Sequence, residues 1–188
     1  MEITEKVLKK ENACTIIAES STVLTDALKQ KTKTTLLNLV QDGIKYFYFG
    51  FLGDFEKFCV EELRGMQKKF VDIRIICIRY GGEPSFTQKE ADFIEKNLRQ
   101  EGFDLSYTVF DAVKCADKKV FGVIPAHPID RNREMLENSS VAIFCIDFNA
   151  KTSDSNNPFL NVIDNAFAKY AYKQAKNRFK LKIINLIN

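Results

Sequence analysis

The 188-residue sequence contains no tryptophan, one histidine and no pair of cysteines in a Cys-x-x-Cys spacing. The histidine, His127, has no cysteine or second histidine near it, so we expect no metal site. No stretch approaches 18 consecutive apolar residues, which argues against a membrane-spanning helix. The chain begins Met1-Glu2-Ile3 and lacks the apolar segment of a signal peptide. These absences predict a cytoplasmic protein with no membrane partner and no cofactor.

The chain has five cysteines, an odd number, at widely spaced positions: Cys14, Cys59, Cys77, Cys115 and Cys145. Four of the five lie in apolar runs. Cysteine in such a run behaves as a small apolar residue. A disulfide framework is therefore not expected, and the reducing environment of the cytoplasm fits this pattern.

Charge and composition are ordinary for a globular protein. Apolar residues make up 45% of the chain and charged residues 28%, with a formal net charge of +3. Basic and acidic residues alternate along the chain, so we do not expect a nucleic-acid partner. The length fits a single domain over residues 1–188, with residues 1–12 as a polar lead-in. A homo-oligomer stays open as an alternative.

Apolar runs alternate with segments of helical periodicity along the whole chain. We predict helices over 23–41, 55–69, 87–100, 128–138 and 158–178, the first capped by Ser20, Ser21 or Thr22 and the second by Asp54. Strands are expected over 13–18, 44–49, 72–79, 140–148 and 180–187, with shorter extended segments over 105–110 and 119–125. Strands that are apolar throughout and separated by helices indicate an α/β fold, a Rossmann-like three-layer sandwich with a mostly parallel sheet.

Ligands of such a sheet bind outside the carboxyl ends of the strands, near the point where the strand order reverses. The first candidate there is the glycine loop after the second strand, with Gly50, Gly53, Asp54 and Glu56. Glycines before a helix start let backbone N–H groups approach an anion, and the helix dipole adds to the attraction. A tight turn that needs glycine explains the loop equally well.

The second candidate is the helix start that holds Arg131, Asn132 and Arg133. Arginine opposes the dipole at a helix start, and an anionic ligand would offset that cost. The alternative is a surface ion pair with Asp130 or Glu134.

Two further loops follow predicted strands. Asp147 ends the most apolar strand and opens a polar loop that reaches Asn157, which is either part of a ligand site or a solvated loop. Glu19 and Ser20 follow the first strand, where helix capping is the favoured explanation of the hydroxyl groups.

Four short motifs occur in the order found in one superfamily: the segment 46–56 (YFYFGFLGDFE), the strand 73–78, the segment 131–140 (RNREMLENSS), and Ala168-x-x-Ala171 followed by 183–186 (IINL). The chain resembles the small uncharacterised branch of the SLOG superfamily of Rossmann-like proteins, over about residues 13–187. That superfamily also holds DNA-processing protein A and the cytokinin-activating phosphoribohydrolases. The resemblance implies recognition of a nucleotide or a nucleotide-derived small molecule.

The sequence departs from that branch at three places. Ala18-Glu19-Ser20 stands where Gly-His-Arg is common, Glu56 replaces an aspartate, and Asn156-Asn157-Pro158 replaces a Gly-Gly-Thr turn. The phosphoribohydrolase signature Pro-Gly-Gly-x-Gly-Thr-x-x-Glu is missing, so that activity is not carried over.

Three functions stay open from the sequence. The first is a sensor or sequestering module that binds a nucleotide-like ligand through Gly50, Gly53, Arg131 and Arg133; we favour it over an enzyme because no paired base and nucleophile is visible. The second is a nucleotide N-glycosidase, with Glu56, Glu19, Asp130 or Asp147 as the acid. The third is a structural subunit with a decayed site. No catalytic residue is assigned.

Overall fold

The computed structural model describes residues 9–19, 21–50, 53–79, 112–115, 128–149 and 158–187. Within these ranges six strands form one sheet in the order β4-β3-β2-β1-β5-β6, and each neighbouring pair is parallel. The strands are β1 (Ala13–Ala18), β2 (Tyr46–Phe49), β3 (Arg74–Arg79), β4 (Ala112–Cys115), β5 (Val141–Cys145) and β6 (Lys182–Asn185). The predicted Rossmann-like α/β fold is confirmed.

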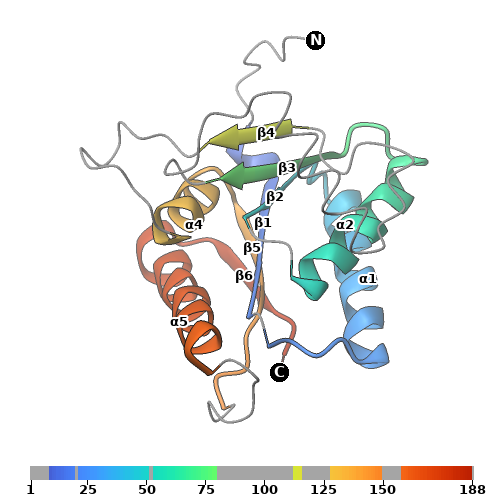
Figure 1. Cartoon of the computed structure of the whole chain (residues 1–188). Coiled ribbons are helices and arrows are strands. Elements are labelled where there is room, and N and C mark those ends of the chain that lie inside the picture. The colour runs from blue at the N-terminus through green and yellow to red at the C-terminus, as the bar shows by residue number, and fades with distance from the viewer. Residues whose placement is uncertain are drawn as a thin grey trace, which may run out of the picture.

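Helices cover both faces of the sheet. Figure 1 shows α1 (Asp26–Gln41) and α2 (Asp54–Gln67) on one side, and α4 (Pro128–Glu137) and α5 (Pro158–Gln174) on the other. A short 3-10 helix, η1 (Lys10–Asn12), precedes β1, and a π-helical turn, η3 (Ala175–Phe179), continues α5. No helix in the described ranges is long and apolar enough to cross a membrane.

The core has two halves because side chains alternate across a strand. From β5, Ile143 and Cys145 pack toward α1 and α2, whereas Ala142 and Phe144 pack toward α4 and α5. All five residues of β5 are buried, which is why this strand reads as a continuous apolar run.

A buried hydroxyl fixes α4 on the sheet. Thr15 Oγ1 donates to the Met135 carbonyl at 2.8 Å and lies 2.7 Å from Ser139 Oγ. Since both partners lie at the end of α4 that leads into β5, this contact also sets where the first turn of α4 lies relative to β1 and β2.

Two predicted helix caps are wrong. The N-cap of α1 is Thr25, whose Oγ1 accepts from the Leu28 N–H at 3.2 Å, and not one of residues 20–22. The chain does not enter the helix earlier because Thr22 bonds back to the sheet, with Oγ1 3.4 Å from the Cys145 carbonyl oxygen. Asp54 does not cap α2 either: the N-cap is Gly53, without a side-chain cap hydrogen bond.

The strand β4 was missed, and several predicted elements lie outside the described residues. β4 has the sequence Ala-Val-Lys-Cys, which is too short and too polar to be predicted as a strand, and among the described residues it pairs with β3. The predicted helix over 87–100, the extended segments over 105–110 and 119–125, and loop residues 150–157 all fall outside the described ranges. The end of α1 is as expected: Gly43 follows it with a φ of 95°.

Candidate functional site at the carboxyl edge of the sheet

The strand order reverses between β1 and β5. From β1 the chain runs through α1 to β2 on one side, while from β5 it runs through α5 to β6 on the other. The helices that follow the two strands cover opposite faces (Figure 1). The crevice at the carboxyl ends of β1 and β5 is therefore where a ligand of this fold is expected.

Side chains complete the sheet's hydrogen bonding along this edge. The Ala18 N–H, at the end of β1, donates to Glu56 Oε1 at 3.0 Å. The Asp147 N–H, beyond β5, donates to Glu19 Oε2 at 3.1 Å. Asn185 of β6 accepts from the Ile146 N–H at 3.2 Å and donates to the Ile146 carbonyl at 3.0 Å. Each of these side chains takes the place of a neighbouring strand where the ladder ends.

Glu56 occupies the first turn of α2 and is only 5% exposed. Burial raises the pKa of its carboxyl group to about 7. Hydrogen bonds from the backbone N–H groups of Glu56 itself, Ala18 and Gly53 act in the opposite direction, as does the nearby charge of Arg131. The bond from Gly53 is the reciprocal half of a capping box. The α2 N-terminus thus already holds a carboxyl group of the chain itself.

The glycine loop consequently differs from the predicted anion cradle. The Gly53 N–H, one of the groups expected to bind an anion, interacts with Glu56. Asp54 lies at the surface, with its side chain 82% exposed and Oδ1 3.9 Å from Lys57 Nζ. Of the two predicted acidic contacts in this loop, Glu56 faces the interior and Asp54 faces solvent.

Gly50 lies directly against Arg131 of α4. Arg131 Nη1 donates to the Gly50 carbonyl at 3.1 Å, while Nε and Nη2 lie 3.3 Å and 3.1 Å from Asn132 Oδ1. A Cβ on Gly50 would overlap Arg131 Nε and lie 2.8 Å from its Cδ and Cζ. The absence of a side chain at residue 50 is what admits the guanidinium, so the structure brings together Gly50, Arg131 and Asn132 of the predicted site.

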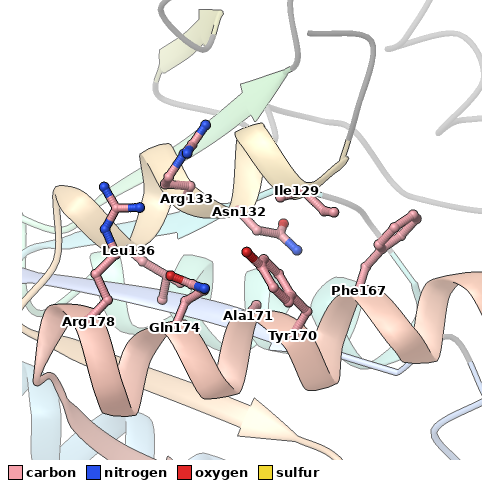
Figure 2. Close-up of a pocket in the computed structure, with 9 residues that line it drawn as sticks. All are labelled: Ile129, Asn132, Arg133, Leu136, Phe167, Tyr170, Ala171, Gln174 and Arg178. Carbon is pink, nitrogen blue, oxygen red and sulfur yellow. The ribbon is translucent and has the colours of Figure 1, made fainter. Parts of the chain in front are cut away.

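Arg133 lies elsewhere. Its Nη2 is 2.8 Å from Asp130 Oδ1, and its side chain lines a small hollow between α4 and α5 with Tyr170, Gln174 and Arg178 (Figure 2). The hollow measures about 20 Å³, room for about one water molecule. Residues two apart on a helix point about 200° apart, which explains why Arg131 and Arg133 do not converge.

Glu19 and Lys169 form a polar pair at the strand reversal. Glu19 was predicted only as a candidate acid of the N-glycosidase, and Lys169 was not predicted at all. Glu19 is 5% exposed, and its Oε1 lies 3.5 Å from Lys169 Nζ of α5, an ion pair without hydrogen-bond geometry. Its position immediately after an apolar strand was the available signal. Asp147, half-buried, accepts from the Asn149 N–H at 2.8 Å through Oδ1; this places the predicted Asp147 beside Glu19.

The described residues contain no group of three or more histidine, cysteine, aspartate or glutamate side chains that could hold a metal ion. The described side chains at this edge include the cations Arg131, Lys31 and Lys169 and carboxyl groups that accept backbone N–H groups. Lys169 is paired with Glu19 and Lys31 donates to the Leu186 carbonyl at 2.8 Å, so Arg131 is the candidate for holding an anionic group.

No protein-family model matches the sequence, and no curated protein is significantly similar to it. The resemblance to the SLOG superfamily consequently stays a prediction based on the four motifs.

Proposed function

We propose that the chain binds a nucleotide or a nucleotide-derived small molecule at the carboxyl edge of its sheet, as a sensor or sequestering module. The observation that carries the proposal is the position of Arg131, held against the Gly50 carbonyl beside the strand reversal. Arginine is suited to phosphate because its guanidinium can donate two parallel hydrogen bonds.

The protonation of Glu56 supports an anionic ligand at Arg131. Because the pKa of Glu56 is raised to about 7, this carboxyl group is largely neutral in mildly acidic solution and about half-ionised near neutrality. Its attraction for Arg131 is weaker than that of a fully ionised carboxylate. Arg131 lies near the N-terminus of α4, where the helix dipole disfavours a positive charge. A ligand phosphate beside Arg131 would offset this unfavourable interaction.

The N-glycosidase alternative needs a carboxyl group that reaches the substrate. Glu56 and Glu19 are each 5% exposed, and each accepts a backbone N–H, from Ala18 at the end of β1 and from Asp147 beyond β5. These contacts are structural ones, so binding is the better-supported proposal. A decayed structural subunit would bind no nucleotide, and a ligand test separates it from a binding module.

The test begins with mass spectrometry of small molecules released from gently purified protein, followed by calorimetric titration with the compound found. Arg131→Gln should weaken binding by about 1.5–3 kcal/mol, the scale for a hydrogen bond to a charged group. Arg178→Gln serves as the control, since Arg178 is an arginine on the α4–α5 hollow whose nearest acidic partner is Glu137 at 3.9 Å.

Three outcomes decide between the functions. Weaker binding in Arg131→Gln alone supports the proposal, and unchanged affinity in that variant contradicts it. A free base that accumulates when protein and nucleotide are incubated would establish the hydrolase instead. Arg133→Gln tests whether the second predicted arginine takes part; we expect a smaller effect because Asp130 already engages it.

A further inference from the structure

Two exposed apolar side chains lie in the loops that follow β1 and β5. Five large apolar side chains are exposed among the described residues, and two of them, Val23 at 76% and Phe148 at 44%, lie in the loops that follow β1 and β5. Contacts between these loops hold them together: Thr22 reaches the Cys145 carbonyl and the Asp147 N–H reaches Glu19. Each of the two loops at the strand reversal thus carries an exposed apolar side chain.

Among the described residues, the ring of Phe148 packs against one other aromatic ring. It makes an edge contact with Tyr172 of α5, with ring centroids 4.9 Å apart and planes at 70°. Tyr172 is in turn edge-on to the buried Phe144, with centroids 5.2 Å apart. An aromatic ring that is oriented by the core yet 44% exposed offers a surface on which another flat ring can stack.

The strands that lead to Arg131 and Phe148 are separated by one strand, β1. Arg131 is held at the end of β2 through Gly50, and Phe148 follows β5, with β1 between them. Two interstrand spacings amount to about 10 Å. A nucleoside monophosphate, with its phosphate at one end and its base at the other, bridges a gap of this size.

We propose that Phe148 is the base-stacking residue of the site and that the ligand is a nucleoside monophosphate, with its phosphate on Arg131. This inference rests on the proposed function, because it assumes that a nucleotide binds at this edge. It adds the ligand class and a residue that determines specificity for a flat ring over a bare sugar phosphate.

The experiment is calorimetric titration of the full chain with AMP, GMP, CMP and UMP, and with ribose 5-phosphate as the probe without a base. Phe148→Ala should bind the preferred monophosphate about 5- to 150-fold more weakly, which corresponds to about 1–3 kcal/mol of base stacking. Its affinity for ribose 5-phosphate should equal that of the wild type. Arg131→Gln should weaken both classes of probe.

Two further variants separate stacking from other causes. Phe148→Leu keeps an apolar side chain without a flat face and should lose most of the same affinity, and it stands in for Phe148→Ala if that variant fails to fold. Tyr170→Ala is the matched control: Tyr170 is an equally exposed aromatic at 45%, but it lines the α4–α5 hollow (Figure 2) and points about 200° away from Tyr172 on α5. We expect wild-type affinity in this variant.

The failures are distinguishable. If a monophosphate binds and both Phe148 variants bind it as the wild type does, the stacking inference is overturned and the proposed function stands. If the Phe148 variants lose monophosphate and ribose 5-phosphate equally, the ring supports the fold and does not stack on a base, which also overturns it. If no monophosphate binds and no nucleotide is released from the purified protein, the proposed function itself fails, and the stacking inference with it.

Discussion

The guanidinium of Arg131 lies over Gly50, with Nη1 donating to the Gly50 carbonyl at 3.1 Å and Nε where a Cβ of residue 50 would be. The φ of Gly50 is outside the left-handed region, unlike that of Gly43. The glycine is consequently explained by space and not by backbone conformation. This contact joins the end of β2 to the first turn of α4, two segments 81 residues apart in sequence.

Gly50→Ala should lower the free energy of unfolding by about 1 kcal/mol, the low end of the range for overpacking, because the overlapping atoms belong to the far end of the Arg131 side chain. In an Arg131→Ala background the same change should cost much less, because the overlapping guanidinium is gone. Urea unfolding of the four proteins in this double-mutant cycle measures the difference. An equal loss of stability in both backgrounds would mean that overlap with Arg131 is not the reason why alanine at residue 50 is unfavourable.

Gly65→Ala is the control for the glycine substitution. Gly65 lies in α2 with no atom within 4 Å of the position that a Cβ would take. Alanine should therefore raise stability here by about 0.5–1 kcal/mol, as in any open helix interior.

The architecture was predictable wherever burial covers both faces of a strand or one face of a helix. β1 and β5 show continuous apolar runs because both faces of the sheet are covered, and the spacing of apolar residues gave α2 and α5 within a few residues of their ends. β4 was not predictable in this way, since a four-residue edge strand with Lys114 at its third position has no apolar run.

The sequence predicted the edge of the sheet at which the candidate residues lie, but not the contacts between them. The loop after β2 and the start of α4 were both expected at the carboxyl edge, and the contact between Gly50 and Arg131 joins them. The burial of Glu56 depends on the Ala18 N–H, 38 residues away in sequence, and no local pattern reports it. The divergence of Arg131 and Arg133, in contrast, follows from helical periodicity alone.

Thr25→Ala should destabilise the protein by about 1 kcal/mol, because the N-cap hydroxyl accepts the Leu28 N–H at the start of α1. Thr34→Ala is the matched control within the same helix: its hydroxyl is exposed and bonds the Gln30 carbonyl of the preceding turn. Alanine at residue 34 should leave stability unchanged or raise it by a few tenths of a kcal/mol. Thermal unfolding of both variants makes the comparison, and equal midpoints would argue against Thr25 as the cap.

Cys14, Cys59 and Cys145 should resist thiol labelling while the protein is folded. All three are buried and free, and burial raises the pKa of Cys14 and Cys145 to about 12 and that of Cys59 well above its usual value. The thiolate is the reactive form, so both access and ionisation oppose the reaction. Peptide mapping after labelling in buffer and in denaturant gives the measurement. Labelling of Cys59 in buffer as fast as in denaturant would contradict its placement.

Glu56→Gln should change how stability depends on pH. The folded protein holds the Glu56 proton with a pKa of about 7, whereas the ordinary value is 4.5, so the folded state binds this proton more tightly than the unfolded state does. Glu56 therefore lowers the free energy of unfolding as pH rises from about 4.5 to about 7, by up to about 3 kcal/mol, and adds no further slope above that range. Glutamine has no proton to lose, and its side-chain oxygen still accepts from the Ala18 N–H.

The test is urea unfolding of wild type and Glu56→Gln between pH 4 and 8. We expect the stability of Glu56→Gln, relative to the wild type, to rise between about pH 4.5 and about pH 7 and to level off above that range. Glu61→Gln makes the same charge change at an exposed position of α2 and controls for net charge. In an Arg131→Gln variant that keeps Glu56, the loss of stability with rising pH should continue to higher pH, because the Arg131 charge lowers the pKa of Glu56 in the wild type. Parallel curves for wild type and Glu56→Gln would show that the pKa of this carboxyl group is the same in the folded and unfolded protein. Glu56 would then be ionised near neutral pH, and Arg131 would already face a full negative charge.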